Sequence, residues 1–269
     1  MERSDMKTSS ELCFDSEGPG ESTPIFDKIW RRDKSLAEIN PAQIHRRRLI
    51  KYFLKKLGIK PASILDIGCG TGELLKELFH VYPNAQFYGC DLSREAGNLT
   101  MAIFTSARFY CFDAEKTQKE AFEKTVDLIT CCEVLEHCSS PIQVIKNAYQ
   151  WLNKGGLFFI SVPAGPMTAY DRSIGHQHHY TTQEIKELLL SEGFCDVHAQ
   201  YWGAPFHTFF RELVRFVSNR NENQNKSNPD RYFLLYYLCC KIFNLLFYFN
   251  FLKSGYQIFS WGIKRINEG

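Results

Sequence analysis

Short apolar segments alternate with helical patterns through the middle of the chain, and this alternation restricts the fold more than any other sequence feature. The apolar segments, each with the length of a typical strand, are Ser63–Ile67, Gln86–Cys90, Arg108–Phe112, Val126–Cys131 and Leu157–Val162. The helical patterns between them are Leu74–Val81, Arg94–Thr105 and Ile142–Leu152. Strands that alternate with helices of about 10–15 residues indicate β-α-β units. They predict an α/β fold with a parallel sheet that helices cover on both faces.

The alternation continues toward the end of the chain, where one long segment interrupts it. Thr182–Glu192 predicts a helix, Phe194–Trp202 predicts a strand, and Gly255–Lys264 predicts the last strand. The stretch 203–254 is too long for an ordinary connection between two strands. We therefore expect one domain over residues 25–269, with a hydrophobic helical insert at 203–254 before the last strand.

The composition and the first residues bear on where the protein works. Residues 1–24 are rich in Ser, Glu and Gly and predict a disordered tail, without the apolar segment of a secretion signal. Ten cysteines without a C-x-x-C pair suit reduced thiols better than disulfides or a zinc site. We therefore expect a cytoplasmic protein. Its net charge of +2 gives no general reason to expect nucleic-acid binding.

A glycine-rich loop connects the first predicted strand to the helix after it. In the segment "ILDIGCGTGELL", Asp66 precedes Gly68, Gly70 and Gly72, and Cys69 lies between the first two glycines. Glycine suits this turn because a Cβ would hinder both the sharp backbone bend and the close approach of a ligand. The G-x-G-x-G spacing differs from the G-x-G-x-x-G of pyrophosphate-binding loops, so phosphate is not the favoured ligand.

Acidic residues end the next two predicted strands at the same edge of the sheet. Asp91, followed by Leu92, lies nineteen residues after Gly72, where a carboxylate can accept hydrogen bonds from both ribose hydroxyls of a nucleoside. Asp113, followed by Ala114, ends the third strand, where a carboxylate can accept from the exocyclic amine of adenine. Together they predict a site for an adenine nucleoside, and a nicotinamide-binding domain with a shortened loop is the alternative.

These segments resemble the motifs of class I S-adenosylmethionine-dependent methyltransferases in order and spacing. The matching segments are "LDIGCGTG", "YGCDLS", "CFDAE", "VDLITCCEVLEH" and "LNKGGLFFISVP", which together cover about Pro61–Pro163. Among methyltransferases of types 11 and 23, the chain looks similar to ubiquinone-pathway O-methyltransferases. The resemblance implies a Rossmann-like sheet of seven strands in the order 3-2-1-4-5-7-6, with the last strand antiparallel and helices on both faces.

The resemblance also implies which residues bind the cofactor, S-adenosylmethionine. The implied contacts are Asp66, Gly68, Cys69, Gly70 and Gly72 to its amino-acid end, Asp91 and Leu92 to the ribose, Asp113 and Ala114 to the adenine, and Cys132 to the sulfonium side.

Two acidic residues and a histidine follow the fourth predicted strand. On a helical turn Glu133 shares a face with Glu136 or His137, which suffices for a general base or for ligands to a hard cation such as Mg²⁺. In ubiquinone-pathway O-methyltransferases and small-RNA 3′-terminal 2′-O-methyltransferases, which look similar here, the E-x-x-E-H unit holds a divalent ion. A structural or positioning role at the start of a helix is the favoured interpretation, and a divalent metal is the alternative.

Three histidines lie close together before the helix that is predicted next. In "GHQHHY", His176, His178 and His179 can reach an acceptor or complete a metal site. The alternative is a surface loop that ends in a helix cap and carries incidental histidines. A similar segment lines the acceptor pocket in many small-molecule members of the family that the chain resembles, which favours His176 and His178. We predict Glu136, His137 and His176 as catalytic residues.

The segment Tyr232–Leu252 is apolar or aromatic except for Lys241, Asn244 and Asn250. Its 21 residues would allow a membrane span by length, but a lysine near the middle makes insertion marginal. A helix buried in the fold, or a lid over the acceptor pocket, is the favoured interpretation. The alternatives are an interfacial helix that admits a lipid-linked acceptor and, least favoured, a true span.

A basic amphipathic helix is predicted before the first strand. Eleven Lys and Arg residues lie within 28–60, against only Asp33 and Glu38. Such a helix could help the chain dock on an anionic membrane, although a charged helix face is more often simply solvated.

The sequence therefore predicts an S-adenosylmethionine-dependent methyltransferase that acts on a small-molecule or lipid-linked acceptor, with oxygen as the favoured target atom. One alternative is an Mg²⁺-dependent RNA 3′-terminal 2′-O-methyltransferase, although no RNA-binding domain is evident. Another is a non-catalytic methyltransferase-fold partner subunit. Peripheral membrane contact through 232–252 is the expected interaction, nucleic acid is not an expected partner, and no pattern predicts an oligomeric state.

Overall fold

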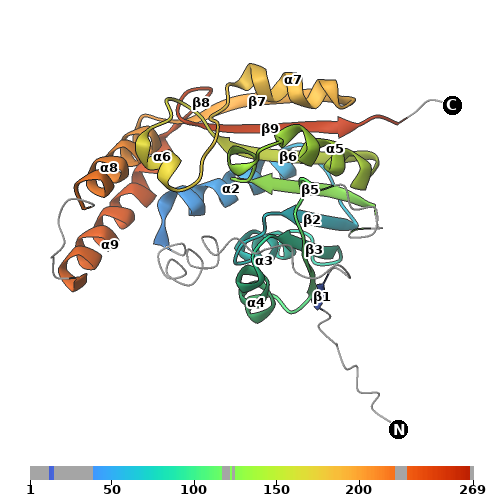
Figure 1. Cartoon of the computed structure of the whole chain (residues 1–269), viewed down its shortest axis with the longest axis horizontal. Helices are drawn as coiled ribbons and strands as arrows, with labels where there is room; N and C mark the ends of the chain where they lie inside the picture. The colour runs from blue at the N-terminus through green and yellow to red at the C-terminus, as the bar shows by residue number, and fades with distance from the viewer. Residues whose placement is uncertain (1–11, 15–38, 117–121, 123–124, 222–228, 267–269) are drawn as a thin grey trace, which may run out of the picture.

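The computed structural model describes residues 12–14, 39–116, 122, 125–221 and 229–266, which fold around one mixed sheet (Figure 1). The strands are β1 Leu12–Phe14, β2 Ser63–Ile67, β3 Gln86–Asp91, β4 Ala107–Cys111, β5 Val126–Cys132, β6 Leu152–Pro163, β7 Phe194–Ala204, β8 Phe251–Leu252 and β9 Gln257–Lys264. The helices are α2 Pro41–Lys56, α3 Glu73–Phe79, α4 Arg94–Ile103, α5 Pro141–Trp151, α6 Ala169–Ser173, α7 Thr182–Ser191, α8 Phe206–Asn221 and α9 Pro229–Leu246. Two 3-10 turns are η1 Leu135–His137 and η2 Phe247–Phe249.

The central part of the sheet has the topology that the sequence predicts. Its strands stand in the order β4-β3-β2-β5-β6-β9-β7. Numbered along the chain, these seven strands have the predicted order 3-2-1-4-5-7-6. The pairs from β4 to β6 are parallel, whereas β9 is antiparallel to both β6 and β7. The predicted fold class is therefore confirmed.

A short strand extends the sheet at each edge, beyond the seven predicted strands. β1 pairs in parallel with β4, and β8 pairs antiparallel with β7. β1 belongs to residues 1–24, for which the sequence predicts a disordered tail; the rest of that segment lies outside the described residues. β8 belongs to the apolar run Tyr232–Leu252, so the run does not continue as a helix to its last residue.

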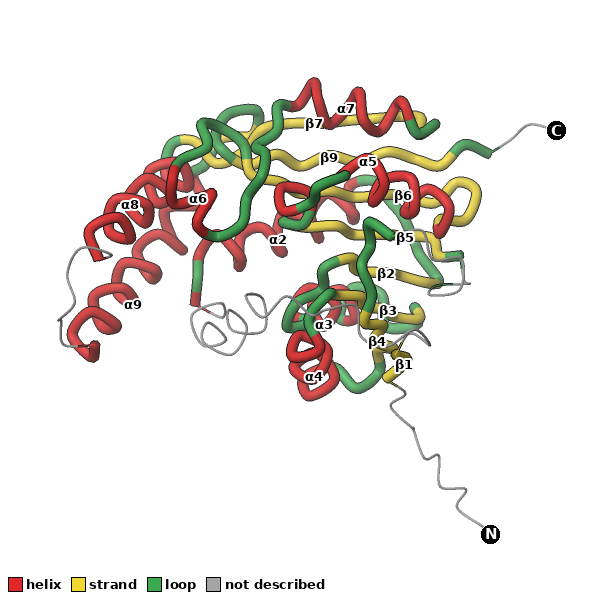
Figure 2. The backbone as a smooth tube through the Cα atoms, viewed as in Figure 1, coloured by secondary structure: helices red, strands yellow, loops and turns green. Residues whose placement is uncertain are grey.

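Helices cover both faces of the sheet and enclose two apolar cores (Figure 2). One core lies beneath α5 and α7, where Val144 and Ile185 are fully buried. The other lies beneath α2 and α3 and continues under the insert, where Ile50, Leu75 and Phe243 are buried. With both faces covered, the central strands are apolar almost throughout. Polar side chains therefore gather at the carboxyl edge of the parallel strands, where such sheets bind ligands.

The insert at 203–254 contributes two helices at one end of the sheet. α8 and α9 lie side by side there, and α9 also packs on α2 (Figures 1 and 2). The predicted apolar helix corresponds to α9, which ends at Leu246. α8 also lies within the predicted helical insert, and its apolar residues recur at helical spacing. Among the described residues, no helix combines the length and the apolar character needed to cross a membrane.

The predicted basic helix is α2, and part of its charge is neutralised inside the fold. Arg47 and Lys51 both pair with Glu77 of α3. Arg46 pairs with Glu133, which directly follows β5, and the two atoms are 2.8 Å apart. This side of α2 therefore joins other elements of the domain and is not a solvated face.

Candidate active site

The glycine loop between β2 and α3 forms one wall of the candidate site. Gly68, Gly70 and Gly72 all have positive φ angles, between 53° and 76°. At Gly68 an added Cβ would collide with the side chain of Val134, which lies directly before η1. The backbone N–H groups of Gly68 and Cys69 both donate to the carbonyl of Cys90 at 2.8 and 3.0 Å. The loop is thus held between the ends of β3 and β5, and glycine is required where it touches η1.

The two carboxylates predicted to bind the nucleoside lie beside this loop. Asp91 accepts hydrogen bonds from the backbone N–H groups of Gly70 at 3.0 Å and Ser93 at 2.9 Å, one on each oxygen. Asp113 accepts from the N–H of Glu115, and Asn147 of α5 donates to the carbonyl of Ala114. The predicted adenine contacts therefore stand on a segment that α5 holds in place.

Asp66 lies at the bottom of the loop and is almost fully buried. Burial raises its pKa to about 7, and the neighbouring charge of Asp91 adds to the increase. The Thr130 hydroxyl donates to Asp66 at 2.7 Å and opposes the shift only in part. Asp66 therefore changes its charge close to neutral pH, at the place predicted for the amino-acid end of a cofactor. Cys132, the predicted sulfonium contact, ends β5 as a free thiol with partial exposure.

Glu133 is held by three partners from separate parts of the chain. Its carboxylate receives Arg46 at 2.8 Å, the Gln257 amide at 2.8 Å and the Ser161 hydroxyl at 3.3 Å. Burial raises the pKa of Glu133, but Arg46 and Gln257 outweigh it, so the net pKa lies below the ordinary value. The backbone of Glu133 has a φ of 59°, a strained conformation for a residue with a side chain. Glu133 is therefore an ionised group in a fixed position.

Glu136 has the opposite environment, although it lies only three residues further on. It is fully buried, and neither carboxyl oxygen makes a hydrogen bond with another described residue. Burial, together with the charge of Glu133, raises the pKa of Glu136 well above its ordinary value. A buried carboxyl group without partners is costly, and its oxygens are suited to a ligand that the fold itself does not supply.

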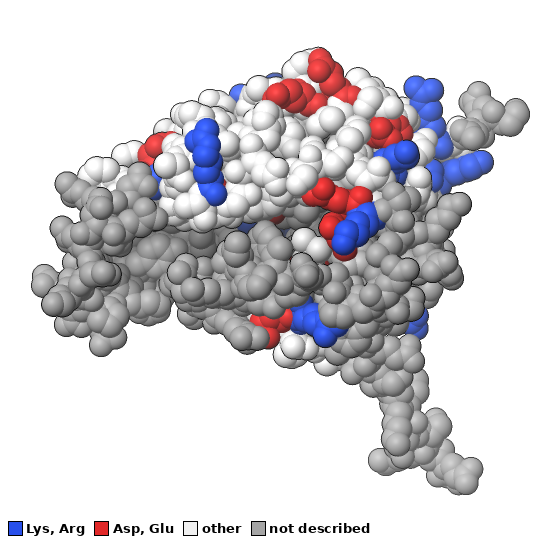
Figure 3. Space-filling model, in the orientation of Figure 1, with Lys and Arg blue, Asp and Glu red and all other residues white. Residues whose placement is uncertain are grey.

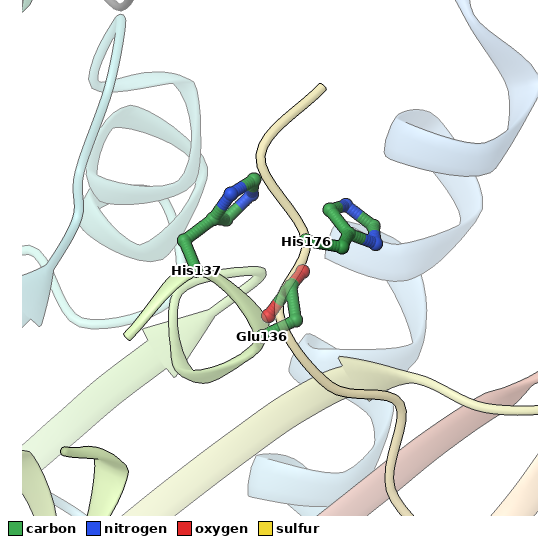
Figure 4. Close-up of side chains that lie close together, drawn as sticks. All are labelled: Glu136, His137 and His176. Atoms are coloured by element: carbon green, nitrogen blue, oxygen red, sulfur yellow. The ribbon is translucent and has the colours of Figure 1, made fainter. Parts of the chain in front are cut away.

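His137 and His176 complete the group around Glu136. The three side chains come from η1 and from the loop before α7, and they lie close together (Figure 4). Their nearest nitrogen and oxygen atoms all lie within 4.8 Å of one another, and the two imidazole rings meet edge to face. The structure therefore brings the three predicted catalytic residues together beside the glycine loop.

A hydrogen-bonded chain of histidines supports His176 from behind. His176 Nδ1 lies 2.8 Å from His179 Nε2, and His179 Nδ1 lies 3.2 Å from the carbonyl oxygen of Gly165. Arg211 of α8 lies 3.3 Å from the same His179 Nε2. Burial, followed by the charge of His137, lowers the pKa of His176 to about 4. His176 is therefore neutral at physiological pH.

The structure separates the two histidines that the resemblance favours together. His178 is exposed and points to Glu184, 3.2 Å away in the first turn of α7. It is His179, not His178, that contacts His176. Thr181 and Glu184 form a reciprocal cap of α7, which agrees with the alternative interpretation for the end of this loop.

The residues suit a divalent cation in part. Two groups have suitable spacing, namely Glu136, His137 and His176, and Asp171, His176 and His179. Asp171 is already engaged with Thr168 and Arg215, whereas the oxygens of Glu136 make no hydrogen bond to described residues. Glu136, His137 and His176 would therefore hold the ion. Glu133 would have to release Arg46 to join them.

Sequence reasoning missed several residues that shape this site. Arg211 donates from one nitrogen to the carbonyls of Ala164 at 3.0 Å and Tyr256 at 2.8 Å, and it also reaches His179. Gln257 of β9 and Arg46 of α2 hold Glu133. Their segments are far from the motifs in sequence. The only available signal was the presence of arginine among aromatic residues in α8.

The glycine loop and the acidic strand ends lie together at the carboxyl edge of the sheet, where the sequence predicts a nucleoside-type cofactor site. A family model described as a methyltransferase domain matches residues 42–199. The ubiquinone biosynthesis O-methyltransferase of Coxiella burnetii (strain Dugway 5J108-111) is 31% identical over 170 residues, which make up 61% of this chain and 68% of that protein. The malonyl-[acyl-carrier protein] O-methyltransferase of Halalkalibacterium halodurans is 33% identical over 116 residues, 42% of each chain.

A solved structure extends the similarity of the fold over most of the chain. Phosphoethanolamine N-methyltransferase 2 of Haemonchus contortus, in complex with phosphomonomethylethanolamine and S-adenosylhomocysteine, matches with a TM-score of 0.58. The match covers 91% of this chain and 58% of that one at 18% identity, so it supports the fold alone. The chain belongs to the methyltransferase-domain family and is a class I S-adenosylmethionine-dependent methyltransferase.

Proposed function

We propose that this enzyme transfers the methyl group of S-adenosylmethionine to an oxygen atom of a small-molecule or lipid-linked acceptor, with His176 as the general base. The observation that carries the proposal is the hydrogen-bonded contact between His176 Nδ1 and His179 Nε2, with the carbonyl of Gly165 at the other nitrogen of His179. Two curated relatives of similar sequence bear names of O-methyltransferases, which supports oxygen as the target atom.

The hydrogen bonds determine which nitrogen of His176 can take a proton. The carbonyl of Gly165 only accepts, so His179 Nδ1 carries a hydrogen. His179 Nε2 then accepts, both from Arg211 and from Nδ1 of His176. His176 therefore carries its hydrogen on Nδ1, which leaves a lone pair on Nε2. This is the tautomer that a general base for an acceptor hydroxyl needs.

The residues of the chain then have separate roles in the transfer. When bound, S-adenosylmethionine supplies a methyl group that is already activated on a sulfonium. Asp91 and Asp113 orient the nucleoside, and Asp66 attracts the ammonium of the amino-acid end. His176 Nε2 takes the proton of the acceptor hydroxyl while the oxygen attacks the methyl carbon. Alignment of donor and acceptor supplies most of the catalysis, because the leaving group is already activated.

Replacement of His176 tests this role, and His178 offers a matched control in the same loop. Activity is measured as transfer of tritiated methyl groups into quinol, glycan, lipid and RNA fractions. We expect label in a small-molecule or lipid fraction, as a methyl ether or ester. His176→Gln should lower kcat by about 10²–10⁴-fold and leave cofactor binding intact, whereas His178→Gln should be nearly neutral. Equal activity of both variants, or label on nitrogen or carbon, would overturn the proposal.

The partnerless carboxyl of Glu136 favours a second version, in which a divalent cation assists the same transfer. Glu136, His137 and His176 would hold the ion, which would stabilise the acceptor oxygen as an alkoxide. In this version, dialysis against EDTA should abolish transfer, and Mg²⁺ or Mn²⁺ should restore it. Activity that persists in EDTA, together with a large loss in His176→Gln, would leave the metal-free base mechanism.

The alternative of an RNA acceptor receives little support from the charges. Arg46, Arg47 and Lys51 of the basic helix form ion pairs with Glu133 and Glu77. On the face in Figure 3, the described residues place acidic and basic groups side by side and form no continuous basic surface. RNA-binding proteins present a clustered basic patch or stripe. Label in the RNA fraction of the transfer assay would be the result that reverses this assignment.

A further inference from the structure

Among the residues that the structure describes, the insert carries a large group of exposed apolar side chains. This surface, the insert face, consists of side chains that are each 42–66% exposed, namely Phe209, Phe216, Val217, Leu235, Leu238, Ile242, Leu245, Tyr248, Phe249, Phe251 and Leu252. The other large apolar residues of comparable exposure in the described part of the chain are scattered over α2, α7 and the end of the chain. Scattered apolar residues are ordinary on a protein surface, whereas a contiguous group marks a binding surface.

α9 shows why this surface is not a by-product of folding. Its inner side packs into the domain core through Cys240 and Phe243, which are at most 6% exposed. Its outer side presents Leu235, Ile242 and Leu245, all at least 60% exposed. Apolar residues at spacings of three and four form one stripe along a helix. α9 is thus apolar on two sides, and the fold buries only one of them.

The charges around the insert face identify the kind of partner. From Arg231 to Asn267 the sequence contains no Asp or Glu. Lys241 and Lys253 are exposed beside the apolar side chains, and Arg48 of α2 lies 3.8 Å above the ring of Tyr248. Tyrosine and lysine around an apolar face are typical of helices that lie in the interface of a bilayer with anionic lipids. Protein interfaces, by contrast, are depleted of lysine, and an apolar stripe of two heptads is short for a coiled coil.

One of the two helices, α8, also reaches the candidate active site. Arg211 and Arg215 of α8 contact the segment that carries Asp171 and His179, while Phe209 and Phe216 of α8 are exposed on the insert face. We propose that the insert face binds the surface of an anionic lipid bilayer and thereby holds the acceptor site at the membrane. On this surface the methyltransferase would meet a lipid-linked acceptor. Only the identity of the acceptor rests on the proposed function, whereas membrane binding does not.

Vesicle binding of the full chain tests the proposal. The chain is sedimented with vesicles of phosphatidylcholine alone and with vesicles that contain phosphatidylglycerol in equal amount. We expect binding to the anionic vesicles and a loss of at least about tenfold in Leu238→Ser/Ile242→Ser/Leu245→Ser. Leu190→Ser, at a residue of α7 that is 56% exposed, is the matched control and should bind like the unchanged chain. Phe243 and Phe247 are unsuitable targets because they are buried.

Charge reversal tests the lipid preference separately. Lys241→Glu/Lys253→Glu should remove the preference for anionic vesicles, whereas Lys146→Glu, at an exposed lysine of α5, should keep it. No binding of the unchanged chain to either vesicle, or equal binding by the triple serine variant, would overturn the proposal. The proposal would also be overturned if the unchanged chain formed a dimer that the triple serine variant converts to monomers, while neither protein bound vesicles. Calorimetry with S-adenosylmethionine needs no membrane, so the failure of this proposal can be distinguished from the failure of the proposed enzymatic function.

Discussion

The carboxyl groups of the site differ in ionisation because the fold surrounds each with different neighbours. Glu133 faces Arg46 and stays ionised. At Glu136, burial and the charge of Glu133 outweigh the more distant Arg46 and Arg211, so the neutral form is favoured. Asp66 lies between these extremes, with a pKa of about 7. Groups whose pKa values the fold moves apart are typical of active sites. The role of Asp66 can be tested by measuring the affinity for the cofactor.

Cofactor binding should depend on pH through Asp66. The ammonium of the amino-acid end of S-adenosylmethionine is attracted more strongly by an ionised carboxylate than by a neutral one. We therefore expect the affinity for S-adenosylmethionine to rise as the pH increases through about 7. Asp66→Asn should bind more weakly at about pH 8 and show a flatter pH dependence. Calorimetric titration of both proteins measures this, and identical pH profiles would contradict the assignment.

The raised pKa of Asp66 also predicts that the cofactor-free protein becomes less stable as the pH rises, whereas cofactor binding becomes stronger. The folded state holds a proton on Asp66 more tightly than the unfolded state, so stability falls as the pH rises from about 4 to about 7. Asp66→Asn removes the titrating carboxyl group, so the variant should not lose this stability as the pH rises. The cofactor-free variant should exceed the unchanged protein in stability at about pH 8 by up to about 4 kcal/mol, and match it near pH 4. Urea unfolding of both proteins at the two pH values measures the difference, and the comparison near pH 4 is the control.

At the level of elements, Asp171 ties α6, α8 and the histidine loop together. It caps α6 through Thr168, receives Arg215 of α8 at 2.7 Å and lies 3.9 Å from His179. Burial raises the pKa of Asp171, but the hydrogen bonds from Thr168 and the charges of the two arginines outweigh it and lower the pKa to about 2. The insert is therefore joined to the active-site loop by a buried ion pair as well as by apolar contacts.

Loss of this ion pair should destabilise the protein strongly. Asp171→Asn leaves the buried guanidinium of Arg215 without its carboxylate, which costs about 3–5 kcal/mol at neutral pH. The contribution of Asp171 is complete above its unfolded pKa of about 4 and is lost as the pH falls through about 2, so the difference should shrink in acid. Urea unfolding measures it. Glu212→Gln removes the exposed partner of Arg215 and should cost less than about 1 kcal/mol.

At the level of the whole molecule, the insert is part of the domain core. Phe243 of α9 packs against Phe210 of α8 and Phe247 of η2. These residues belong to the same apolar cluster as Phe53 of α2 and Phe259 of β9. The insert therefore has to be folded for the back of the sheet to be covered, and the domain should unfold as one cooperative unit.

Neighbouring residues of α9 should differ sharply in their effect on stability. Phe243→Ala removes a buried ring and should cost about 3–5 kcal/mol, in a single unfolding transition. Ile242→Ala, at a side chain that is 60% exposed, should change the stability by less than about 0.5 kcal/mol. Similar values for the two variants in urea unfolding would show that α9 is not anchored as the structure describes.

Local patterns were sufficient to predict most of the sheet and the placement of the glycine loop and the acidic strand ends at its carboxyl edge. Apolar runs and turn residues indicate β2 to β6, and the glycine loop with Asp91 and Asp113 lies where the motifs indicate. The predicted Glu136, His137 and His176 also lie together. These residues sit at the ends of consecutive strands or in the loops that follow them. Their proximity therefore follows from the parallel topology of the sheet.

The sequence by itself determined the fold class, the cofactor loop and the carboxyl edge of the sheet, because periodicity and glycine requirements act over a few neighbouring residues. Tertiary structure alone decided that Arg46 neutralises Glu133, that His179 and not His178 supports His176, and that Arg211 of α8 reaches His179. It also decided which side of α9 is buried. Each of these depends on segments that lie far apart in the chain, and packing and desolvation between such segments leave no periodic signal in the sequence.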